Sequence, residues 1–406
     1  MKKIVLASEG SNGDLFPMLA LANELMRLGH DVVVCAPPNN DSFVRKCGFQ
    51  FIPIGVDFQA LLQEHADKVM GKNPMRIMKL TVKLLREQVQ RHISQLKEAA
   101  IDADIMIASG VMYAARSVAE YYRIPFRLSV AIPQVLPSRS YPPLLINALD
   151  CPQWVNRFLW WGDSKFQNRM ILKTLNEERD KLGLPPVRDI QHYLLNDIII
   201  PADPVLEPVR ANPAFRFTQT AYWHFEDGAD LDPSISQFIE EGDPPVFIGF
   251  GSSTDPDPLR TRNILNEVIE KSGQRFIILK GWAELGTGLN HANVRTIDFA
   301  PYLKLFPKMG AIIHHGGSGT THCAARSGVP QIIIPHAMDQ YRWGSTIAAK
   351  KLGPDPINRS KLTADKLLHA IKEAVTNSEF KKQASQVGHL MRQKNGVEEF
   401  IRQFPL

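Results

Sequence analysis

Cysteine is scarce in this 406-residue sequence, and its four copies, Cys35, Cys47, Cys151 and Cys323, lie far apart with no CxxC pair. This spacing argues against structural zinc, and a disulfide framework is uncommon in a chain of this size. No stretch approaches the roughly 20 apolar residues that a membrane-spanning helix needs. The apolar run after the two N-terminal lysines is too short for a signal peptide. We therefore expect a cytoplasmic protein without stable membrane insertion, and peripheral membrane contact stays open.

A strong charge imbalance is also missing. The chain carries 47 Lys and Arg against 42 Asp and Glu, a formal net charge of +5. This mild excess allows an anionic small ligand, but it does not call for nucleic acid, and basic runs interleaved with aromatic residues are absent. A chain of this length exceeds one typical hydrophobic core, which predicts two domains.

The first half alternates apolar strands with amphipathic helices. KKIVLAS predicts a buried strand and SEGSNG a tight loop, and a helix follows from Asp14 to its stop at Gly29. HDVVVCAPP predicts the next buried strand, and ADIMIASG and PFRLSVA continue the alternation. A β-loop-α-β opening of this kind predicts a parallel, doubly wound sheet.

The composition changes near the middle of the chain, where it becomes turn-rich and acidic. We therefore expect an N-terminal domain over residues 1–204 and an interdomain linker over 205–243. A second alternation opens with PPVFIGFGSS and predicts a second αβ domain over 244–377. Residues 378–406 predict a helical tail that packs back on the N-terminal domain.

Residues 131–165 differ from the rest, because a Pro-rich stretch is followed by Trp154, Phe158, Trp160 and Trp161. Such clusters are more often core beneath a long loop, but they also suit a hydrophobic binding wall. The sequence leaves both interpretations open.

The familiar dinucleotide motifs do not fit. The loop after the first strand, SEGSNG, lacks the first glycine of GxGxxG, and the second strand ends without the acid that would hold a ribose. The phosphate-loop motif GxxxxGK[ST] is also absent.

The segment GAIIHHGGSGTTHCAARSG fits an anion better, since it reads as a strand, a small-residue loop and a helix that Gly328 stops. Small residues at a helix start let backbone N–H groups close on a phosphate, and the helix dipole favours negative charge. His315 could add a side-chain donor. A flexible turn without a ligand is the alternative.

Asp339 and Gln340 follow the next strand, QIIIP, at the carboxyl edge where open αβ sheets bind ligands. A carboxylate beside an amide can accept from and donate to sugar hydroxyls, so the two loops together suggest a nucleotide-sugar. Asp339 could instead cap the following helix.

Three Asp-x-Asp triplets could in principle hold a metal: Asp102–Asp104, Asp230–Asp232 and Asp255–Asp257. One abuts a strand start and the others lie among prolines and turn residues, so acidic turns explain them. We expect no metal site.

These motifs resemble those of GT-B glycosyltransferases of family 1. HHGGSGTT, GVPQIIIP and the DQ pair resemble the donor-binding signature, and SEGSNGDLFPMLALA resembles the GSxGDxxP loop. VVVCAPP, PADPVLEP, PPVFIGFGSS and KGWAELG resemble the vancomycin-group enzymes, and DQYRWG resembles sterol glucosyltransferases. The likeness spans nearly the whole chain. It implies a GT-B fold, with two Rossmann-like doubly wound domains facing a central cleft, and inverting transfer without a metal.

The resemblance also implies roles for individual residues. Those that would bind the donor are Gly251, Ser252, Trp282, His315, Gly317, Ser318, Gly319, Thr320, Asp339 and Gln340. Of these, Asp339 and Gln340 would hold the sugar, Trp282 would lie near the base, and the rest would approach the diphosphate. Asp14 would be the general base, although it could instead only N-cap its helix. The acceptor would contact Ser11, Asn12, Met75, Met78 and Trp154.

The expected function is therefore transfer of a hexose, with glucose favoured, to a hydroxyl of a lipophilic or aromatic small-molecule acceptor. UDP-glucose is favoured over a dTDP-sugar as donor, no further cofactor is expected, and the protein would be a monomer or homodimer. Cys323 stands where plant members have a ribose-binding Glu, which leaves uridine and thymidine open. A nucleotide-sugar epimerase and a catalytically inactive GT-B partner protein are the alternatives.

Overall fold

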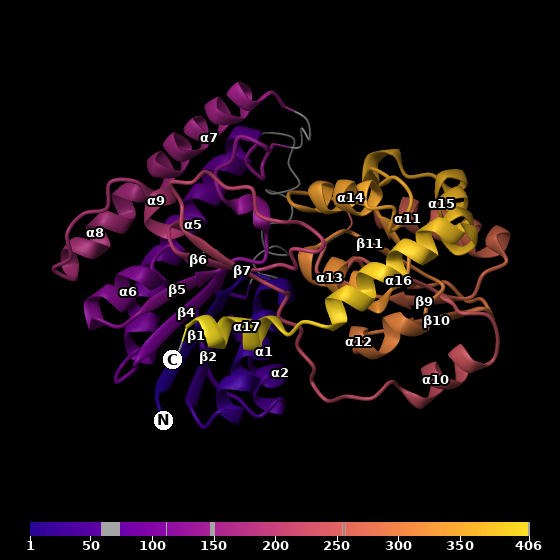
Figure 1. Ribbon diagram of the computed structural model, residues 1–406, viewed down its shortest axis with the longest axis horizontal. Coiled ribbons are helices and arrows are strands. Elements are labelled where there is room, and N and C mark those ends of the chain that lie inside the picture. Colours follow the sequence, from indigo (N-terminus) through magenta and orange to yellow (C-terminus); the bar gives the residue numbers. More distant parts are fainter. Residues whose placement is uncertain (58–73, 111, 147–150, 254, 256, 405–406) are drawn as a thin grey trace. The chain divides into compact units, whose positions relative to one another are not determined.

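The computed structural model describes the chain except residues 58–73, 111, 147–150, 254, 256 and 405–406, and it describes only the backbone of residues 74–78 (Figure 1). The chain divides into two compact units. Unit 1 comprises Met1–Pro201, Val209–Phe225 and Gly396 to the C-terminus, and unit 2 comprises Ala202–Pro208 and Glu226–Asn395.

Unit 1 is built on a seven-stranded sheet with the order β3-β2-β1-β4-β5-β6-β7, and every strand pair is parallel. Its strands are β1 (Lys3–Glu9), β2 (Asp31–Ala36), β3 (Gln50–Pro53), β4 (Ile105–Gly110), β5 (Phe126–Ser129), β6 (Ile198–Pro201) and β7 (Phe217–Thr220). Ile4 to Glu9 are all buried. A parallel sheet covered by helices on both faces favours such continuous apolar strands over alternating ones.

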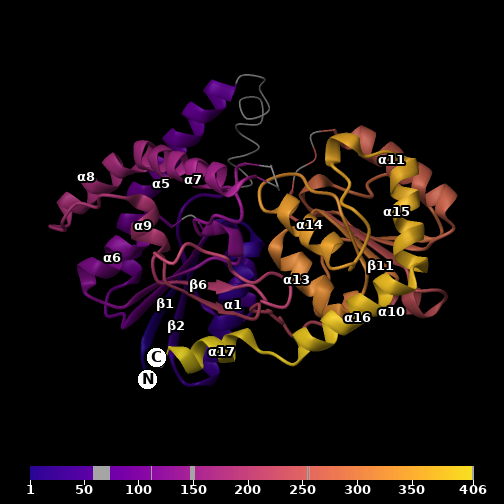
Figure 2. The same cartoon turned by 45° about the horizontal axis from the view of Figure 1, so that its top comes forward.

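The helices of unit 1 connect these strands, except α17, which follows unit 2 in the chain (Figure 2). They are α1 (Asn12–Arg27), α2 (Asp41–Lys46), α5 (Pro74–Ala99), α6 (Ala115–Tyr122), α7 (Gln153–Gln167), α8 (Lys173–Lys181), α9 (Ile190–Leu195) and α17 (Gly396–Gln403). Met18, Leu21 and Leu25 of α1 are fully buried and form the apolar face of this amphipathic helix. They pack in one core with Trp223 and with Phe400 of α17.

Unit 2 contains a five-stranded parallel sheet with the order β10-β9-β8-β11-β12. Its strands are β8 (Val246–Gly249), β9 (Phe276–Leu279), β10 (Val294–Ile297), β11 (Ala311–His314) and β12 (Gln331–Ile333). Its helices are α10 (Pro233–Glu240), α11 (Pro258–Ser272), α12 (Tyr302–Leu305), α13 (Ser318–Ser327), α14 (Gln340–Ala349), α15 (Ala364–Thr376) and α16 (Ser378–Arg392).

Successive strand residues of unit 2 enter two separate cores, because side chains alternate across a sheet. Val246 and Ile248 pack with residues of α11 and α15 on one face. Phe247 packs with residues of α10, α12 and α13 on the other. Each unit is thus a Rossmann-like layered domain, as the sequence predicts.

The boundary region differs from the expected linker over 205–243. Residues 217–220 form β7 at the edge of the first sheet, residues 202–208 belong to unit 2, and residues 233–240 form α10. The turn-rich composition of this region concealed a four-residue strand whose partner, β6, fixes it by backbone hydrogen bonding.

The expected helical tail over 378–406 is divided between the two units. Helix α16 packs on α13, where a Cβ added to Gly388 would lie only 2.8 Å from Gly328 Cα. Only α17 belongs to unit 1, where Trp223 Nε1 donates to Gly396 O (3.0 Å) and the Ala221 N–H donates to Glu399 (2.8 Å).

Candidate functional site

The loop between β11 and α13 places its small residues at the carboxyl edge of the second sheet. Strands β8 and β11 are neighbours there, and strand order reverses between them, which is where open αβ sheets bind ligands. Helix α13 begins with Gly317 as N-cap, which has no side chain to cap the helix. The first-turn N–H groups of Ser318, Gly319 and Thr320, with the dipole of α13, therefore suit an anion.

His315 lies in this loop, and its ring packs against the backbone of two glycines, Gly317 and Gly251. A Cβ on Gly317 would lie 2.4 Å from His315 Nε2, and one on Gly251 would lie 3.4 Å from His315 Cε1. Gly251 also has a φ of 55°, in the left-handed region that favours glycine. The imidazole is 9% exposed, and its Nδ1 is buried with no hydrogen-bond partner among the described residues. An unpaired buried nitrogen is costly, so this atom points to a ligand.

The sequence suggests His315 as a side-chain donor, and the structure shows its charge state. Burial, and then the neighbouring His314 and His336 rings, lower the pKa of His315 to about 3. The imidazole is therefore neutral near pH 7 in the ligand-free protein. A diphosphate beside it would favour the protonated form and raise that pKa.

The loops after β8 and β9 meet beside His315. Trp282 N donates to Gly251 O (3.0 Å), and a Cβ on Gly281 would lie 2.4 Å from the same oxygen. The structure thus brings Gly251, Trp282 and His315 together, and Ser252 follows Gly251 directly as a partly buried residue.

Asp339 is the N-cap residue of α14 and Gln340 is its first residue, and both side chains have partners. Asp339 does not cap the helix with its side chain; Oδ2 accepts instead from Trp343 Nε1 (3.1 Å). Burial raises the pKa of Asp339 to about 6. Gln340 Oε1 accepts from the N–H groups of His336 (2.8 Å) and Ala337 (3.0 Å). Its carbonyl oxygen therefore holds its own loop, and its NH2 group is the part suited to a sugar.

Asp14 lies in the first turn of α1, just after β1, within a capping box. Ser11 is the N-cap of α1, its Oγ accepts from Gly13 N (3.3 Å), and Ser11 N donates to Asp14 Oδ2 (3.2 Å). The alternative that Asp14 is the N-cap is therefore wrong, because Ser11 is the N-cap of α1. Asp14 is the third residue of the helix and completes the capping box. Gly10, at φ 139°, leaves room for the carboxylate, because a Cβ there would lie 2.2 Å from Asp14 Oδ2.

The residues expected to bind the acceptor do not form one cluster in the described structure. Ser11 caps α1 and Asn12 is exposed at its first position. Trp154 lies on α7 with 73% of its surface exposed. The side chains of Met75 and Met78 lie outside the described residues. The aromatic cluster itself divides, because Trp160 is core, with Nε1 donating to Tyr141 O (2.8 Å).

Sequence reasoning missed a buried polar group beside Asp14. Glu9 ends β1 and is 8% exposed, with Oε2 3.1 Å from His92 Nε2 and Oε1 accepting from Gln88 Nε2 (3.1 Å). Both partners come from α5. The signal in the sequence was a Glu at the end of a strand of mostly apolar residues. A carboxylate buried there needs polar partners, which would have pointed to a polar cluster.

His322 is a second missed residue. It is fully buried in α13, accepts from Asp203 N through Nε2 (3.0 Å), and lies 2.7 Å from Ser318 O through Nδ1. Since the Asp203 N–H must donate, the proton sits on Nδ1, which donates to the Ser318 carbonyl. Burial lowers the pKa of His322 to about 4, so this neutral ring links the 202–208 segment to the start of α13.

The Asp-x-Asp triplets have structural partners. Asp232 and Asp257 cap α10 and α11, and Asp255 pairs with the buried Arg359. In the part of the chain that the structure describes, no group of three or more His, Cys, Asp or Glu is arranged to hold a metal.

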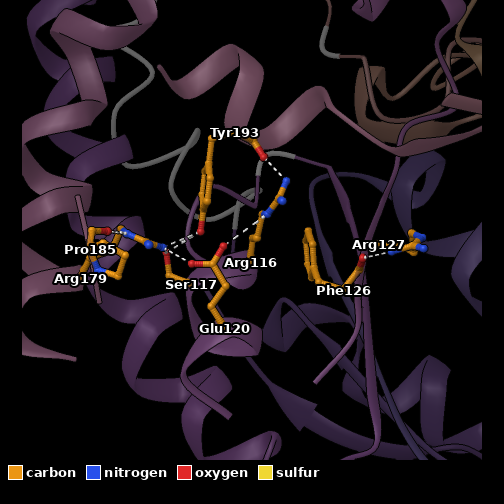
Figure 3. Close-up of polar contacts among 8 residues, drawn as sticks. All are labelled: Arg116, Ser117, Glu120, Phe126, Arg127, Arg179, Pro185 and Tyr193. Carbon is orange, nitrogen blue, oxygen red and sulfur yellow. Dashed lines mark hydrogen bonds and ion pairs between the residues drawn. The ribbon is translucent and has the colours of Figure 1, made fainter. Parts of the chain in front are cut away.

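Another polar cluster lies at the amino ends of β5 and β6 (Figure 3). Arg179, with its side chain 4% exposed, donates to Glu120 (2.6 Å), Tyr193 (2.7 Å) and Ser117 (3.0 Å). A pocket of about 220 Å³ beside it is lined by Arg116, Glu120, Phe126, Arg127 and Asp197, among others. The cluster lies at the edge of the sheet opposite Asp14, and the hydrogen bonds of Arg179 join α8 to α6 and α9. We therefore interpret the cluster as a link between these three helices.

Comparison with known proteins covers both units. Residues 4–138 match the glycosyltransferase family 28 N-terminal domain, and residues 264–403 match the erythromycin biosynthesis protein CIII-like C-terminal domain. The vancomycin aglycone glucosyltransferase of Amycolatopsis orientalis is 33% identical over 363 residues, which cover 86% of this chain and 85% of that protein.

Two further likenesses extend this result. A sterol 3-beta-glucosyltransferase of Arabidopsis thaliana is 29% identical over 421 residues, covering 97% of this chain and 66% of that protein. The crystal structure of the glycotransferase of kitacinnamycin has the same fold, with a TM-score of 0.74 at 17% identity, covering 99% of this chain and 98% of that one.

Proposed function

Because the chain belongs to the GT-B glycosyltransferase family of the vancomycin aglycone glucosyltransferase, we propose that it moves glucose from UDP-glucose to a hydroxyl of a lipophilic aglycone or sterol. Transfer inverts the anomeric centre and needs no metal. The names of the bacterial and the plant relative support both glucose and a lipophilic acceptor.

The observation that carries this proposal is the loop around His315. A buried nitrogen without a partner, two glycines that make room for the ring, and an uncapped helix start converge at one sheet edge. Backbone N–H groups and the dipole of α13 would stabilise the departing diphosphate as its charge develops. The neutral His315 would donate to a phosphate oxygen and gain a proton as that charge approaches.

Asp14 is proposed as the general base. Its carboxylate would accept the proton of the acceptor hydroxyl while the hydroxyl oxygen attacks the anomeric carbon opposite the leaving diphosphate, which gives inversion. The capping box supports this role, because the Ser11 N–H fixes the orientation of the carboxylate. Ser11 and Asn12 would contact the acceptor from the same loop.

On the sugar side, Asp339 would accept from hydroxyl groups and the NH2 group of Gln340 would donate to them. The backbone contacts of Gln340 Oε1 support this division, because they turn its NH2 group away from the loop they hold. Trp282 would lie near the base of the nucleotide.

The test is incubation with UDP-glucose and a panel of phenols and sterols, followed by mass spectrometry, with dTDP-glucose run in parallel. We expect a mass increase of one hexose on at least one acceptor, with UDP-glucose the better donor. A sugar-nucleotide isomer as the sole product would instead identify an epimerase. Donor binding without any product on a broad panel would favour an inactive partner protein.

A further inference from the structure

Helix α7 exposes an unusual amount of aromatic surface. Trp154, Phe158 and Trp161 are 73%, 64% and 58% exposed, and the rings of Phe158 and Trp161 stack at a centroid distance of 5.7 Å. Burying such rings would be strongly favourable, so their exposure on one helix indicates a surface that contacts something else.

The exposed side chains lie on one side of α7. At about 100° per residue, Trp154, Arg157, Phe158, Trp161 and Lys165 fall within an arc of about 100°. All five are exposed, and together they form the aromatic face of α7. The one acidic residue of the helix, Asp163, lies on the opposite side, where it accepts from Gln167 and Gln191. The face therefore combines three aromatic rings with two cations and no acid.

We propose that the aromatic face of α7 docks on the surface of an anionic lipid bilayer. Tryptophan and phenylalanine enter the boundary between headgroups and acyl chains, and Lys and Arg on the same face meet anionic headgroups. Charge complementarity selects a negatively charged partner. The face carries no uncharged hydrogen-bonding side chain apart from the indole N–H groups, which favours lipid over a protein surface.

The neighbouring helix α5 adds to the positive charge of this part of unit 1 (Figure 2). A groove of about 470 Å³ is lined by Lys79, Lys83, Arg86 and Glu87, together with Thr174 of α8. Lys83 pairs with Glu87 (3.8 Å), and the three cations outnumber the one acid. Arg86 Nε donates to Met170 O (2.8 Å), in the segment that joins α7 to α8. None of the helices in the described ranges is both long and apolar enough to span a bilayer.

The proposal does not depend on the proposed function, and vesicle binding tests it without any acceptor. The full-length protein would be sedimented with vesicles of phosphatidylcholine alone or with roughly one-third phosphatidylserine. We expect binding to the anionic vesicles, quenching of tryptophan fluorescence by brominated lipid, and weak binding to phosphatidylcholine. The triple variant Trp154→Gln, Phe158→Gln, Trp161→Gln should lower the partition coefficient about tenfold or more.

Two further variants make the test specific. Arg157→Glu with Lys165→Glu should remove the preference for anionic vesicles and leave the far-UV circular dichroism unchanged. Leu259→Gln with Phe299→Gln changes side chains that are 63% and 52% exposed in unit 2, and it should not alter binding. The proposal is wrong if the native protein binds neither vesicle or if this control pair lowers binding as much as the triple variant. It is also wrong if sedimentation velocity shows a dimer that the triple variant abolishes, because the face would then join two copies of the chain.

Discussion

The two units use the same β-loop-α connection in opposite ways. After β1, the helix start is closed by its own chain, since Ser11 and Asp14 satisfy each other's backbone N–H groups in a capping box. After β11, the N-cap is Gly317, which has no side chain, and we propose that the start of α13 binds an anion beside the unpaired Nδ1 of His315. The first loop presents a positioned carboxylate, and the second presents N–H donors. The first loop is therefore suited to accepting a proton, and the second is suited to binding a phosphate.

The largest expected effect is the loss of the base in the first loop. Asp14→Asn should lower kcat by roughly 10²–10⁴, because the amide cannot accept a proton from the acceptor. Its oxygen can still accept from Ser11 N, so the melting temperature and UDP affinity should stay close to those of the native protein. Steady-state kinetics and thermal denaturation give both values.

A matched variant separates catalysis from capping at this loop. Ser11→Ala breaks the capping box and should cost about 1 kcal/mol of unfolding free energy while leaving much more of kcat than Asp14→Asn. A near-native rate for Asp14→Asn would place the base elsewhere and leave Asp14 with a capping role.

Substitutions in the second loop, between β11 and α13, should change the affinity for the donor. His315→Ala should weaken UDP binding by roughly 10- to 100-fold, equivalent to 1.5–3 kcal/mol for a hydrogen bond to a charged group. Gly317→Ala should act in the same direction, because its Cβ would lie 2.4 Å from His315 Nε2. Calorimetry with UDP measures both.

The equivalent change in the first loop is the control. A Cβ on Gly13 would meet only Ser11 Oγ, at 3.4 Å, so Gly13→Ala should leave UDP affinity unchanged. Equal losses of UDP affinity in Gly13→Ala and Gly317→Ala would contradict the different roles of the two loops.

A smaller and more selective effect is expected from Gln340→Glu. The new carboxylate keeps an oxygen for the His336 and Ala337 N–H groups and removes the NH2 group. UDP affinity should therefore stay nearly constant, and kcat/KM for UDP-glucose should fall about tenfold, the value of one hydrogen bond. A parallel loss of UDP affinity would show that the side chain acts through the phosphate loop instead.

The pH dependence of donor binding should reveal the neutral state of His315. The free pKa of His315 is lowered to about 3, and a bound diphosphate raises it, so the complex holds more protons than the free protein. Binding of UDP-glucose should then strengthen as pH falls from about 8 to about 5, by at most tenfold per unit. Calorimetry in buffers of different ionisation enthalpy should show proton uptake, which His315→Ala should remove. Proton release on binding would contradict this assignment.

The smallest expected effect is that of metal removal. If the N-terminus of α13 and His315 stabilise the negative charge of the diphosphate without a metal ion, EDTA should leave the transfer rate essentially unchanged. Activity that EDTA abolishes and Mg²⁺ or Mn²⁺ restores would show that the second loop alone does not meet that charge.

The sequence predicted the layered αβ architecture well, because long apolar strands and amphipathic helices are local signals. The family assignment and the GT-B fold were confirmed by the relatives and by the matching structure. The boundaries were less predictable, since β7 has only four residues and depends on hydrogen bonds to β6. The candidate roles of the site residues stay predictions.

The buried polar groups could not be predicted because their partners are distant in the sequence. Asp203 is 119 residues from His322, and Glu9 is 83 residues from His92. The aromatic cluster shows a similar limit. Adjacent tryptophans at 160 and 161 have opposite environments, one buried and one exposed, which only the helix phase of α7 decides.

The chain passes between the two units more than once, and this has a consequence for engineering. Trp223 packs against Phe400, with ring centroids 5.1 Å apart, so the core of unit 1 is complete only with the last helix. A chimaera that exchanges donor specificity with a relative must therefore be joined near residues 226 and 395 rather than at one place, and it must exchange residues 202–208 as well, because Asp203 N donates to His322 of α13. A single crossover would leave Trp223 facing a foreign C-terminal helix, and we expect the hybrid to lose stability in the core of unit 1.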